Sequence, residues 1–290
     1  MIDGSGRKIV SSSETKDINF MRAEAKFMMK SLRVNFDDEK AFRIAELILD
    51  FLKSDGKVED IIDVIIELEG YAPMSRSESF FWRLVYIRRR IEESIKDKDI
   101  GISLLDNLYM CARHFDSICE IEPTLHNKAC RILEYLYVVD YLYDNSKKET
   151  DAAEMKKILD NMKDDFSKIE EPHEKVYWKA GAKLSALLFN CRDKVKEYES
   201  EADKAFGGWI YCSVEAHRCD ENYINPLGNF ANRYFEYIES SVYSYTADER
   251  EHIELMIKWL AKAIESGKTG LDGYLEKFKK HLEKFENKNS

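Results

Sequence analysis

The chain has 290 residues, of which 44% are hydrophobic and only 4 are Pro and 12 are Gly, a composition typical of a compact, helix-rich protein. Asp and Glu outnumber Lys and Arg by 55 to 45, and the net charge of −10 argues against a general surface for nucleic acid or anionic membranes. No apolar run approaches the roughly 20 residues of a membrane span, and the N-terminus lacks the apolar segment of a signal peptide. We therefore expect a cytoplasmic protein with no nucleic-acid or membrane partner.

Helical periodicity runs almost from end to end of the chain, without convincing strand alternation. In the first half the predicted helices cover about residues 12–32, 38–54, 58–70, 75–97, 101–118 and 123–143. In the second half they cover about residues 151–168, which we expect to be an amphipathic helix at the solvent side, 172–188, 193–217, 225–240, 248–266 and 272–285. Pro123 is placed in a first helical turn, and the pair Gly207-Gly208 interrupts its helix. The predicted fold class is all-α, an antiparallel bundle of about ten to twelve helices with short connections.

Six cysteines are scattered through the helical patterns, and in a chain of this size we expect reduced, mostly buried thiols of an intracellular protein. They are Cys111, Cys119, Cys130, Cys191, Cys212 and Cys219. A zinc site could use Cys111 with His114, or His217 with the two cysteines on either side of it. Neither group repeats as paired zinc ligands, so we expect no metal.

Catalytic motifs are equally weak. Glu249 and His252 have the Glu-x-x-His spacing of di-iron carboxylate bundles, which need a second copy and two further glutamates. We find no second copy and interpret the pair as a solvated helix start, with a helical-bundle metalloenzyme as the rival interpretation. No Gly-rich phosphate loop follows a strand, and no Ser/His/Asp or Cys/His set has positional support. We expect neither an enzyme nor a cofactor.

The predicted helix at residues 225–240 carries two different stripes. One is apolar and faces a core: Leu227, Phe230, Ala231, Tyr234 and Ile238. The other places Asn229, Asn232 and Glu236 at positions i, i+3 and i+7, so that they project together over about two turns. Two amides and a carboxylate can bind an extended peptide main chain, since amides donate and accept and a carboxylate accepts an amide proton. The alternative is an ordinary solvated polar face.

Three segments resemble the 14-3-3 proteins. Residues 229–238 follow the peptide-binding helix of that family, residues 71–83 align without gaps and share Tyr71, Trp82 and Arg83, and residues 174–179 resemble a third family segment. The resemblance covers roughly residues 24–288. It implies one helical domain with a concave groove, preceded by an extension at residues 1–23 and enlarged by an insertion around residues 144–171.

The resemblance implies a signalling adaptor that binds phosphoserine or phosphothreonine peptides of partner proteins. In that family the Asn and Glu equivalent to Asn229 and Glu236 contact the peptide main chain, and Lys179 matches another lysine of the groove. The family also forms dimers through its first helices, so a homodimer or heterodimer is expected. The apolar faces at residues 21–32 and 41–52 are compatible with such a dimer and equally compatible with internal packing.

The phosphate-binding residues of the family are missing here. A dianionic phosphate needs fixed cations, and the family uses a Lys, two Arg and a Tyr. The matching positions are Ala72, Ser79, Ala186 and Leu187, or Leu187 and Leu188 for the last two if the register moves by one. We propose as a hypothesis that a basic pocket has been rebuilt one helical turn away. Its cations would be Arg76, Arg83, Lys179 and Lys183, and the alternative is that they are ordinary surface or ion-paired side chains.

Two further interpretations stay open. The run Arg88-Arg89-Arg90 beside Glu92-Glu93 could bind an anion, but a salt-bridged helix face is the simpler interpretation. At the level of function, the fold could serve a phospho-independent or self-occluded adaptor, or the chain could be a scaffold of stacked helical hairpins without a peptide groove. No 34-residue tetratricopeptide pattern repeats cleanly along the chain.

Overall fold

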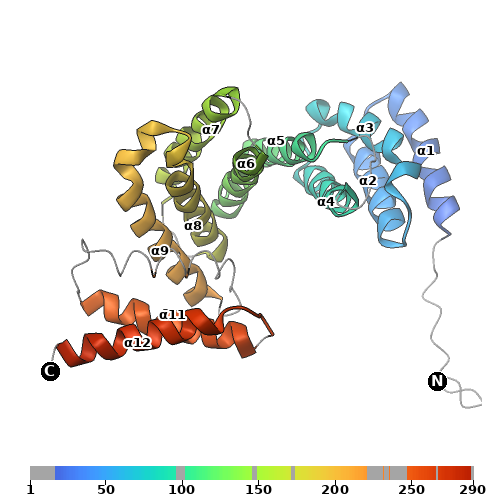
Figure 1. Ribbon diagram of the computed structural model, residues 1–290. Helices are drawn as coiled ribbons and strands as arrows, with labels where there is room; N and C mark the ends of the chain where they lie inside the picture. Colours follow the sequence, from blue (N-terminus) through green and yellow to red (C-terminus); the bar gives the residue numbers. More distant parts are fainter. Residues whose placement is uncertain are drawn as a thin grey trace, which may run out of the picture. The chain divides into compact units, whose positions relative to one another are not determined.

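Figure 1 shows the computed structural model of the chain, which describes residues 17–95, 102–145, 149–170, 174–220, 231, 235, 247–265 and 267–288. Within these ranges there are eleven α-helices and four short 3-10 helices, and no strand. The predicted all-α fold and its number of helices are therefore confirmed. The chain divides after Ser146 into two compact units, and each is described by itself. That they form one 14-3-3-like domain stays a prediction.

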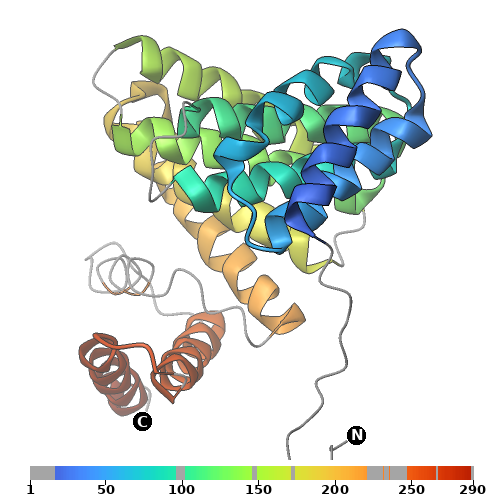
Figure 2. The ribbon, with the colours of Figure 1, turned by 90° about the vertical axis from the view of Figure 1, so that its right-hand side faces the viewer.

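Unit 1 contains six α-helices and two 3-10 helices, which are joined by short connections. Their bounds are α1 Ile18–Val34, α2 Asp38–Lys53, η1 Val58–Asp60, α3 Ile62–Gly70, η2 Ala72–Met74, α4 Glu78–Ile95, α5 Leu104–Ile121 and α6 Leu125–Asn145. The main packing pairs are α1 with α2, α2 with α4, α4 with α5, and α5 with α6, which lie side by side in Figures 1 and 2. Most of these contacts thus join helices that are close in the sequence.

The core of unit 1 is built from the apolar stripes of these helices. The buried residues of α1 are Met21, Ala25, Met29 and Leu32, and those of α2 include Ala41, Ala45, Ile48 and Leu49. The two apolar faces considered for a dimer therefore pack inside unit 1. Burial of aliphatic and aromatic side chains contributes about 1.5–3 kcal/mol for each residue, so these stripes dominate the stability of the unit.

Several helices of unit 1 begin later than predicted because a polar side chain caps them. The carboxylate of Asp17 accepts the N–H of Asn19 at 2.9 Å, so α1 begins at Ile18 and includes part of the predicted extension. Ser77 Oγ accepts the N–H of Phe80 at 3.3 Å, so α4 begins at Glu78 and not at residue 75.

Pro123 was predicted in the first turn of a helix, and this placement is wrong. Thr124 Oγ1 accepts the N–H of Asn127 at 3.1 Å, and α6 begins at Leu125. Pro123 therefore precedes the capping residue. In that place it still stops a helix from extending backwards, because the residue before a proline is pushed out of the helical region.

Unit 2 contains the remaining helices. They are α7 Glu149–Ser167, α8 Lys175–Asn190, η3 Cys191–Asp193, η4 Lys196–Glu201, α9 Ala202–Cys219, α11 Ala247–Glu265 and α12 Asp272–Lys288. The pairs α8–α9 and α11–α12 each lie side by side in Figures 1 and 2, and α7 packs on α8. The imidazole of His217 on α9 stacks on Trp259 of α11 with 5.1 Å between ring centroids. The unit thus has its own core.

Two predictions for unit 2 need correction. The helix predicted at residues 193–217 begins only at Ala202, after two 3-10 helices, and it runs through Gly207 and Gly208 without interruption. The reason for the late start is tertiary: Tyr198 is buried and its O–H donates to Asp160 Oδ1 of α7 at 2.9 Å. The amphipathic pattern predicted for α7 is confirmed, because the helix buries one apolar stripe: Met155, Ile158, Leu159 and Met162.

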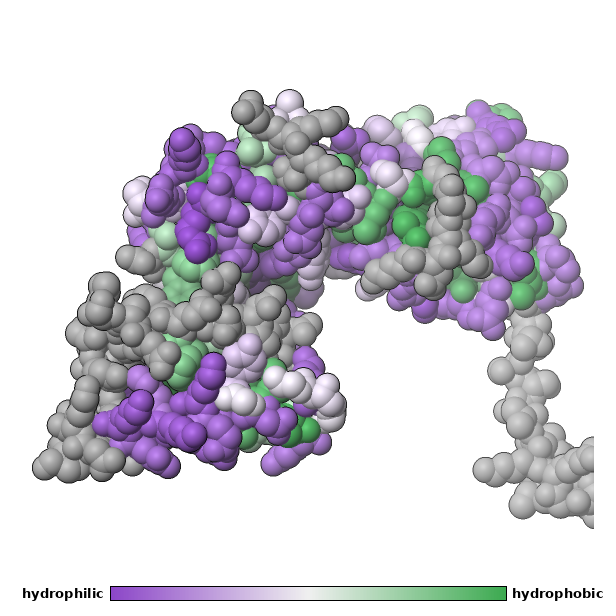
Figure 3. Space-filling model, in the orientation of Figure 1, coloured by the Kyte–Doolittle hydropathy of each residue, from purple (hydrophilic) through white to green (hydrophobic). Residues whose placement is uncertain are grey.

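On the face drawn in Figure 3, hydrophilic residues (purple) predominate and hydrophobic residues (green) form separate areas. Of the helices in the described ranges, none is both long enough and apolar enough to cross a membrane.

Candidate functional site

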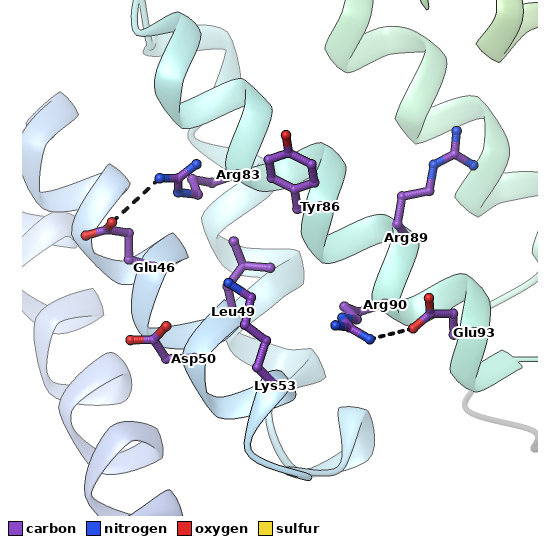
Figure 4. Close-up of a pocket in the computed structure, with 9 residues that line it drawn as sticks. All are labelled: Glu46, Leu49, Asp50, Lys53, Arg83, Tyr86, Arg89, Arg90 and Glu93. Carbon is purple, nitrogen blue, oxygen red and sulfur yellow. Dashed lines mark hydrogen bonds and ion pairs between the residues drawn. The ribbon is translucent and has the colours of Figure 1, made fainter. Parts of the chain in front are cut away.

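A groove on unit 1 lies between α2 and α4 and encloses about 390 Å³ (Figure 4). The residues that line it are Glu46, Leu49, Asp50, Lys53, Arg83, Tyr86, Arg89, Arg90 and Glu93. Four of these side chains are cationic and three are anionic. The groove therefore combines a slight excess of positive charge with an exposed aromatic ring and one buried leucine.

The spacing of residues on α4 explains the groove. Phe81, Leu84 and Ile91 are buried in the core, while Arg83, Tyr86 and Arg90 at positions i, i+3 and i+7 share the face that borders the groove. A helix places such residues on one side, one above the other. The guanidinium groups of both arginines can therefore reach a single ligand that lies along α4.

The cations on this face are only weakly paired. Arg83 Nη2 lies 3.8 Å from Glu46 Oε1, and its Cζ lies 5.1 Å from the ring centroid of Phe42. Arg90 Nη1 lies 2.9 Å from Glu93 Oε2, an ion pair within one turn whose two side chains are both exposed (Figure 4). Exposed pairs of this kind contribute only about 0.2–1 kcal/mol. A more highly charged anion can therefore replace the carboxylates of Glu46 and Glu93 as the partner of these arginines.

Arg89 lines the groove but is held by other residues. Its guanidinium lies 2.9 Å from Glu92, forms an ion pair with Glu134 of α6, and sits 5.5 Å above the ring of Tyr137. Burial lowers the pKa of Arg89, but the carboxylates of Glu134 and Glu92 outweigh burial and raise it. In Figure 4 its guanidinium points away from Lys53 and Arg90. Arg89 thus links α4 to α6 through its ion pair with Glu134.

The predicted cations of unit 1 have different positions. Arg83 lines the groove, whereas Arg76 lies in the link before α4 and does not. The Arg76 side chain is exposed and forms no ion pair with a described residue, while its backbone N–H donates to Asp38 Oδ2 at 3.4 Å. Sequence reasoning missed Lys53 and Tyr86. Tyr86 could have been identified from the sequence, because it lies between Arg83 and Arg90 on one helical face.

The other two predicted cations lie on α8 of unit 2. Lys179 and Lys183 follow Lys175 at successive intervals of four residues, so they form a lysine stripe on one face. Lys175 forms an ion pair with Asp220 at the end of α9. Partial burial lowers the pKa of Lys179, and the nearby charge of Lys175 lowers it further. The stripe is therefore a place where bound negative charge would be stabilising.

The positions matching the missing phosphate clamp are mostly inside the protein. Ala72 is 8% exposed and Ala186 is 9% exposed, and the leucines that follow Ala186 are also buried, whereas Ser79 is exposed. A lysine or arginine introduced at either alanine would place its stem in the core. At the two alanine positions, orientation as well as residue type is therefore unsuited to holding a phosphate.

The predicted peptide-binding residues Asn229, Asn232 and Glu236 lie outside the described residues. Two residues of the same predicted helix are described: Ala231 and Phe235 are helical and buried. The ring of Phe235 lies 5.6 Å from that of Phe278 on α12. Ala231 therefore faces a core, as the apolar stripe predicts.

The metal interpretations find no geometric counterpart in the part of the chain that the structure describes. No group of three His, Cys, Asp or Glu side chains there is arranged to hold a metal ion. His114 instead lies with Nε2 3.2 Å from Glu69 Oε1 in the core, and the Cys111 thiol is buried. Glu249 and His252 belong to α11, but their side chains lie outside the described ones.

Comparison of the chain with protein-family models, curated proteins and solved structures gave no match. The resemblance to 14-3-3 proteins therefore stays a hypothesis that rests on the three segments quoted above. The interpretation of function rests on the geometry of the groove and of the lysine stripe.

Proposed function

We propose that this protein is a 14-3-3-like adaptor that binds a phosphorylated segment of a partner protein, with the phosphate held in the α2–α4 groove. One observation carries the proposal: Arg83 and Arg90 stand two turns apart on the groove face of α4, with exposed Tyr86 between them. Lys53 lines the same groove from the end of α2 and forms no ion pair with a described residue. Three cations can thus converge on one dianionic group.

The energies favour exchange of partners when a phosphate arrives. A phosphoserine carries about −1.5 to −2 charges and three acceptor oxygens at neutral pH. Arginine binds such a group through two parallel hydrogen bonds, which are roughly twice as strong as neutral ones. The present partners of Arg83 and Arg90 are single carboxylates. The Arg83–Glu46 pair is half-buried with 3.8 Å between the charged atoms, and the Arg90–Glu93 pair is exposed, so exchanging these partners for a phosphate costs little stability.

The remaining residues of the groove would select what surrounds the phosphate. Tyr86 and Leu49 offer apolar contact, and the carboxylates of Glu46, Asp50 and Glu93 repel a uniformly acidic ligand. The same carboxylates can accept hydrogen bonds from a basic side chain or from peptide N–H groups. We therefore propose a ligand that combines a phosphorylated residue with a neighbouring basic residue.

The test is binding of one fluorescent peptide with an Arg-Ser-x-Ser-x-Pro motif, phosphorylated or unphosphorylated on its second serine, at two salt concentrations. We expect preference for the phosphorylated form, weaker binding at higher salt because of screening, and a loss of at least about tenfold in the double variant R83Q/R90Q. The matched control is R218Q, since Arg218 forms a similar pair with Glu215 one turn away on α9. Equal binding of the two peptides would overturn the proposal.

A second variant separates two placements of the phosphate. If K179Q/K183Q removes the preference for phosphate and R83Q/R90Q does not, the anion binds on the lysine stripe of α8. If neither peptide binds to the wild type or to either variant, the result supports a second candidate function. In that case the protein would be a scaffold of stacked helical hairpins. The observation that favours the scaffold is that most helix contacts join neighbours in sequence, as in repeat proteins.

The proposed compartment is the cytoplasm, where protein kinases can modify a partner. The observation that supports it is that all six cysteines are free thiols. Disulfides form and persist in oxidising compartments and are rare where glutathione keeps thiols reduced.

A further inference from the structure

The groove between α2 and α4 has a definite order of side chains along its length. Two cations, Lys53 and Arg90, stand at one end, which we call the cationic end (Figure 4). Glu46 marks the other end, seven residues earlier on α2, and Leu49 and Tyr86 line the part between. Seven residues of a helix rise about 10 Å. A segment that matches this order carries an anion, then apolar side chains, then a cation about 10 Å from the anion.

The chain itself contains a segment with this order. Residues 7–11 read Arg-Lys-Ile-Val-Ser and precede the described residues. If Ser11 carried a phosphate, two apolar side chains would separate it from Lys8, which is three residues away. An extended chain spans about 3.3 Å for each residue, so these two positions are about 10 Å apart. This spacing equals that between the cationic end of the groove and Glu46.

The first turn of α1 brings this segment close to the cationic end. Because α1 and α2 are joined by three residues and pack on each other, they run antiparallel, and α1 begins beside the end of α2. Arg22 of α1 accordingly lies 3.8 Å from Asp60, seven residues after the end of α2. The six residues from Asp17 back to Ser11 span up to about 20 Å, and a helix with its side chains is about 10–12 Å across. Residues 7–11 can therefore pass the end of α2 and enter the groove.

We propose that Ser11 is a phosphorylation site and that phosphorylated Ser11 occupies the α2–α4 groove of its own chain. A protein kinase supplies the modification: Ser11 Oγ forms a bond to the γ-phosphorus of ATP, the bond from that phosphorus to its bridging oxygen breaks, the hydroxyl proton is released and ADP leaves. The inference rests on the proposed function, because the same groove would hold a partner's phosphate. Phosphorylation of the chain would thus switch off the binding of partner segments.

Charge makes the occupancy depend on the modification. The phosphate of Ser11 would lie between Lys53 and Arg90, the two apolar side chains would contact the middle of the groove, and Lys8 would pair with Glu46. Phosphorylation adds about −1.5 to −2 charges and three acceptor oxygens. Without it, Ser11 offers the two cations only a neutral hydroxyl, so the groove stays open to a partner.

Attachment to the same chain strengthens the competition against a partner segment. A short linker gives a bound group an effective concentration of about millimolar. A partner segment with a micromolar dissociation constant then competes with a large local excess of the internal one. We therefore expect phosphorylation of Ser11 to weaken partner binding at least about tenfold.

The first test observes the phosphate directly, by phosphorus NMR of the full chain with phosphoserine incorporated at position 11. Nearby cations favour the dianion, so we expect its second pKa to lie below the value of about 6 that phosphoserine has in the synthetic peptide 1–16. K53Q/R90Q should remove this shift. The matched control K204Q/R218Q, which changes a Lys and an Arg at exposed positions of α9, should keep it. Identical titrations of the chain and the peptide would overturn the inference.

The second test measures the affinity of the full chain for the fluorescent phosphopeptide of the binding assay above. We expect at least about tenfold weaker binding when Ser11 is phosphorylated, by the same factor at every protein concentration, because the competing group belongs to the same chain. The control is phosphoserine at Ser13, which adds the same charge. It lies about 16 Å from Lys8 and cannot satisfy both ends of the groove, so the loss should be clearly smaller.

A charge exchange fixes the register of the segment in the groove. For each variant we compare the affinities of the chains with and without phosphoserine at position 11. K8E should reduce their ratio, K8E/E46K should restore it, and K16E, outside the matching segment, should leave it unchanged. Circular dichroism confirms that each variant is folded.

The outcomes separate this inference from the proposed function. If the unmodified chain binds the phosphopeptide and phosphorylation of Ser11 leaves its affinity unchanged, only the inference is overturned. If the unmodified chain does not bind the phosphopeptide, the proposed function fails and the inference fails with it. A loss of affinity that depends on protein concentration would show binding between chains and would overturn the placement in the chain's own groove.

Discussion

Glu69 of α3 and Arg88 of α4 form a two-point ion pair in the core of unit 1. Arg88 Nε donates to Glu69 Oε1 at 2.6 Å, and a second N–H of the guanidinium donates to Oε2. His114 of α5 lies 3.2 Å from Oε1, and Arg88 Nη1 donates to Asn107 Oδ1 at 3.4 Å. The cluster joins α3, α4 and α5. Its charged groups can be buried because each of them has a partner of opposite charge or a hydrogen bond.

We expect the variant R88M to destabilise the protein by about 3–5 kcal/mol, since it leaves the carboxylate of Glu69 buried without its main partner. R90M on the same helix is the control, because Arg90 is exposed and such changes stay within about 0.5 kcal/mol. Urea unfolding followed by circular dichroism measures both. Similar midpoints for the two variants would contradict the assigned role of the buried pair.

Glu134 predicts a specific dependence of stability on pH. Its carboxylate is buried, Oε1 pairs with Arg89, and Oε2 has no hydrogen-bond partner among the described residues. Burial raises the pKa of Glu134 although Arg89 lowers it, so the folded state keeps a proton that the unfolded state loses. The contribution of Glu134 to stability therefore falls as pH rises from about 4.5 through the raised pKa.

The matching experiment compares the wild type with E134Q by urea unfolding at pH 4.5 and pH 7. We expect the free energy of unfolding of the wild type, relative to that of E134Q, to decrease between the two pH values. A difference that is constant or that increases with pH would show that the Glu134 pKa is not raised.

Gly181 on α8 sets the distance between α8 and α9. A Cβ at this position would lie 2.7 Å from Cys212 Sγ and 2.7 Å from Phe166 Cζ, whereas a Cβ at Gly207 would meet no side chain of the described residues within 4 Å. We expect G181A to destabilise unit 2 by about 1–3 kcal/mol through overpacking. G207A, in the middle of α9, should stabilise it by up to about 1 kcal/mol through higher helix propensity. Thermal unfolding of the two variants should therefore shift in opposite directions.

The thiols should differ in reactivity. Burial raises the pKa of Cys111 and the pKa of Cys212 to about 12, while Cys219 is exposed. The thiolate is the reactive form, so we expect Cys219 to react first with a thiol reagent in the native protein and C219S to lack this phase. The release of thionitrobenzoate from Ellman's reagent measures the rate of this thiol reaction. Equally fast reaction of Cys111 in native protein would contradict its burial.

Hydrophobic periodicity was sufficient to predict the fold class. The residues predicted to face inward on α2, among them Ala41, Ala45 and Ile48, are buried, because one helix face follows directly from a 3.6-residue period. Helix boundaries were less predictable. The late start of α9 depends on the bond between Tyr198 and Asp160, whose positions are 38 residues apart, and no local pattern contains such a contact.

The candidate groove was predicted only in part, and three adjacent arginines show why. Arg88 is buried against Glu69, Arg89 is held between Glu92 and Glu134, and Arg90 borders the groove. Each step along a helix turns the side chain by about 100°, so neighbours in sequence enter different environments. The salt-bridged face predicted from the sequence is confirmed for Arg89 and Arg90 and was wrong for Arg88. Which face meets another helix is decided by tertiary packing.

The packing of helices on their neighbours in sequence also bears on how the chain acquires its structure. In unit 1, α1–α2 and α5–α6 are each joined by three residues and α4–α5 by eight, so their contacts close short loops. Closing a short loop loses little chain entropy, and domains rich in local contacts fold in microseconds to milliseconds. A growing polypeptide can therefore complete each helical hairpin soon after its second helix has been synthesised, before the residues of unit 2 exist.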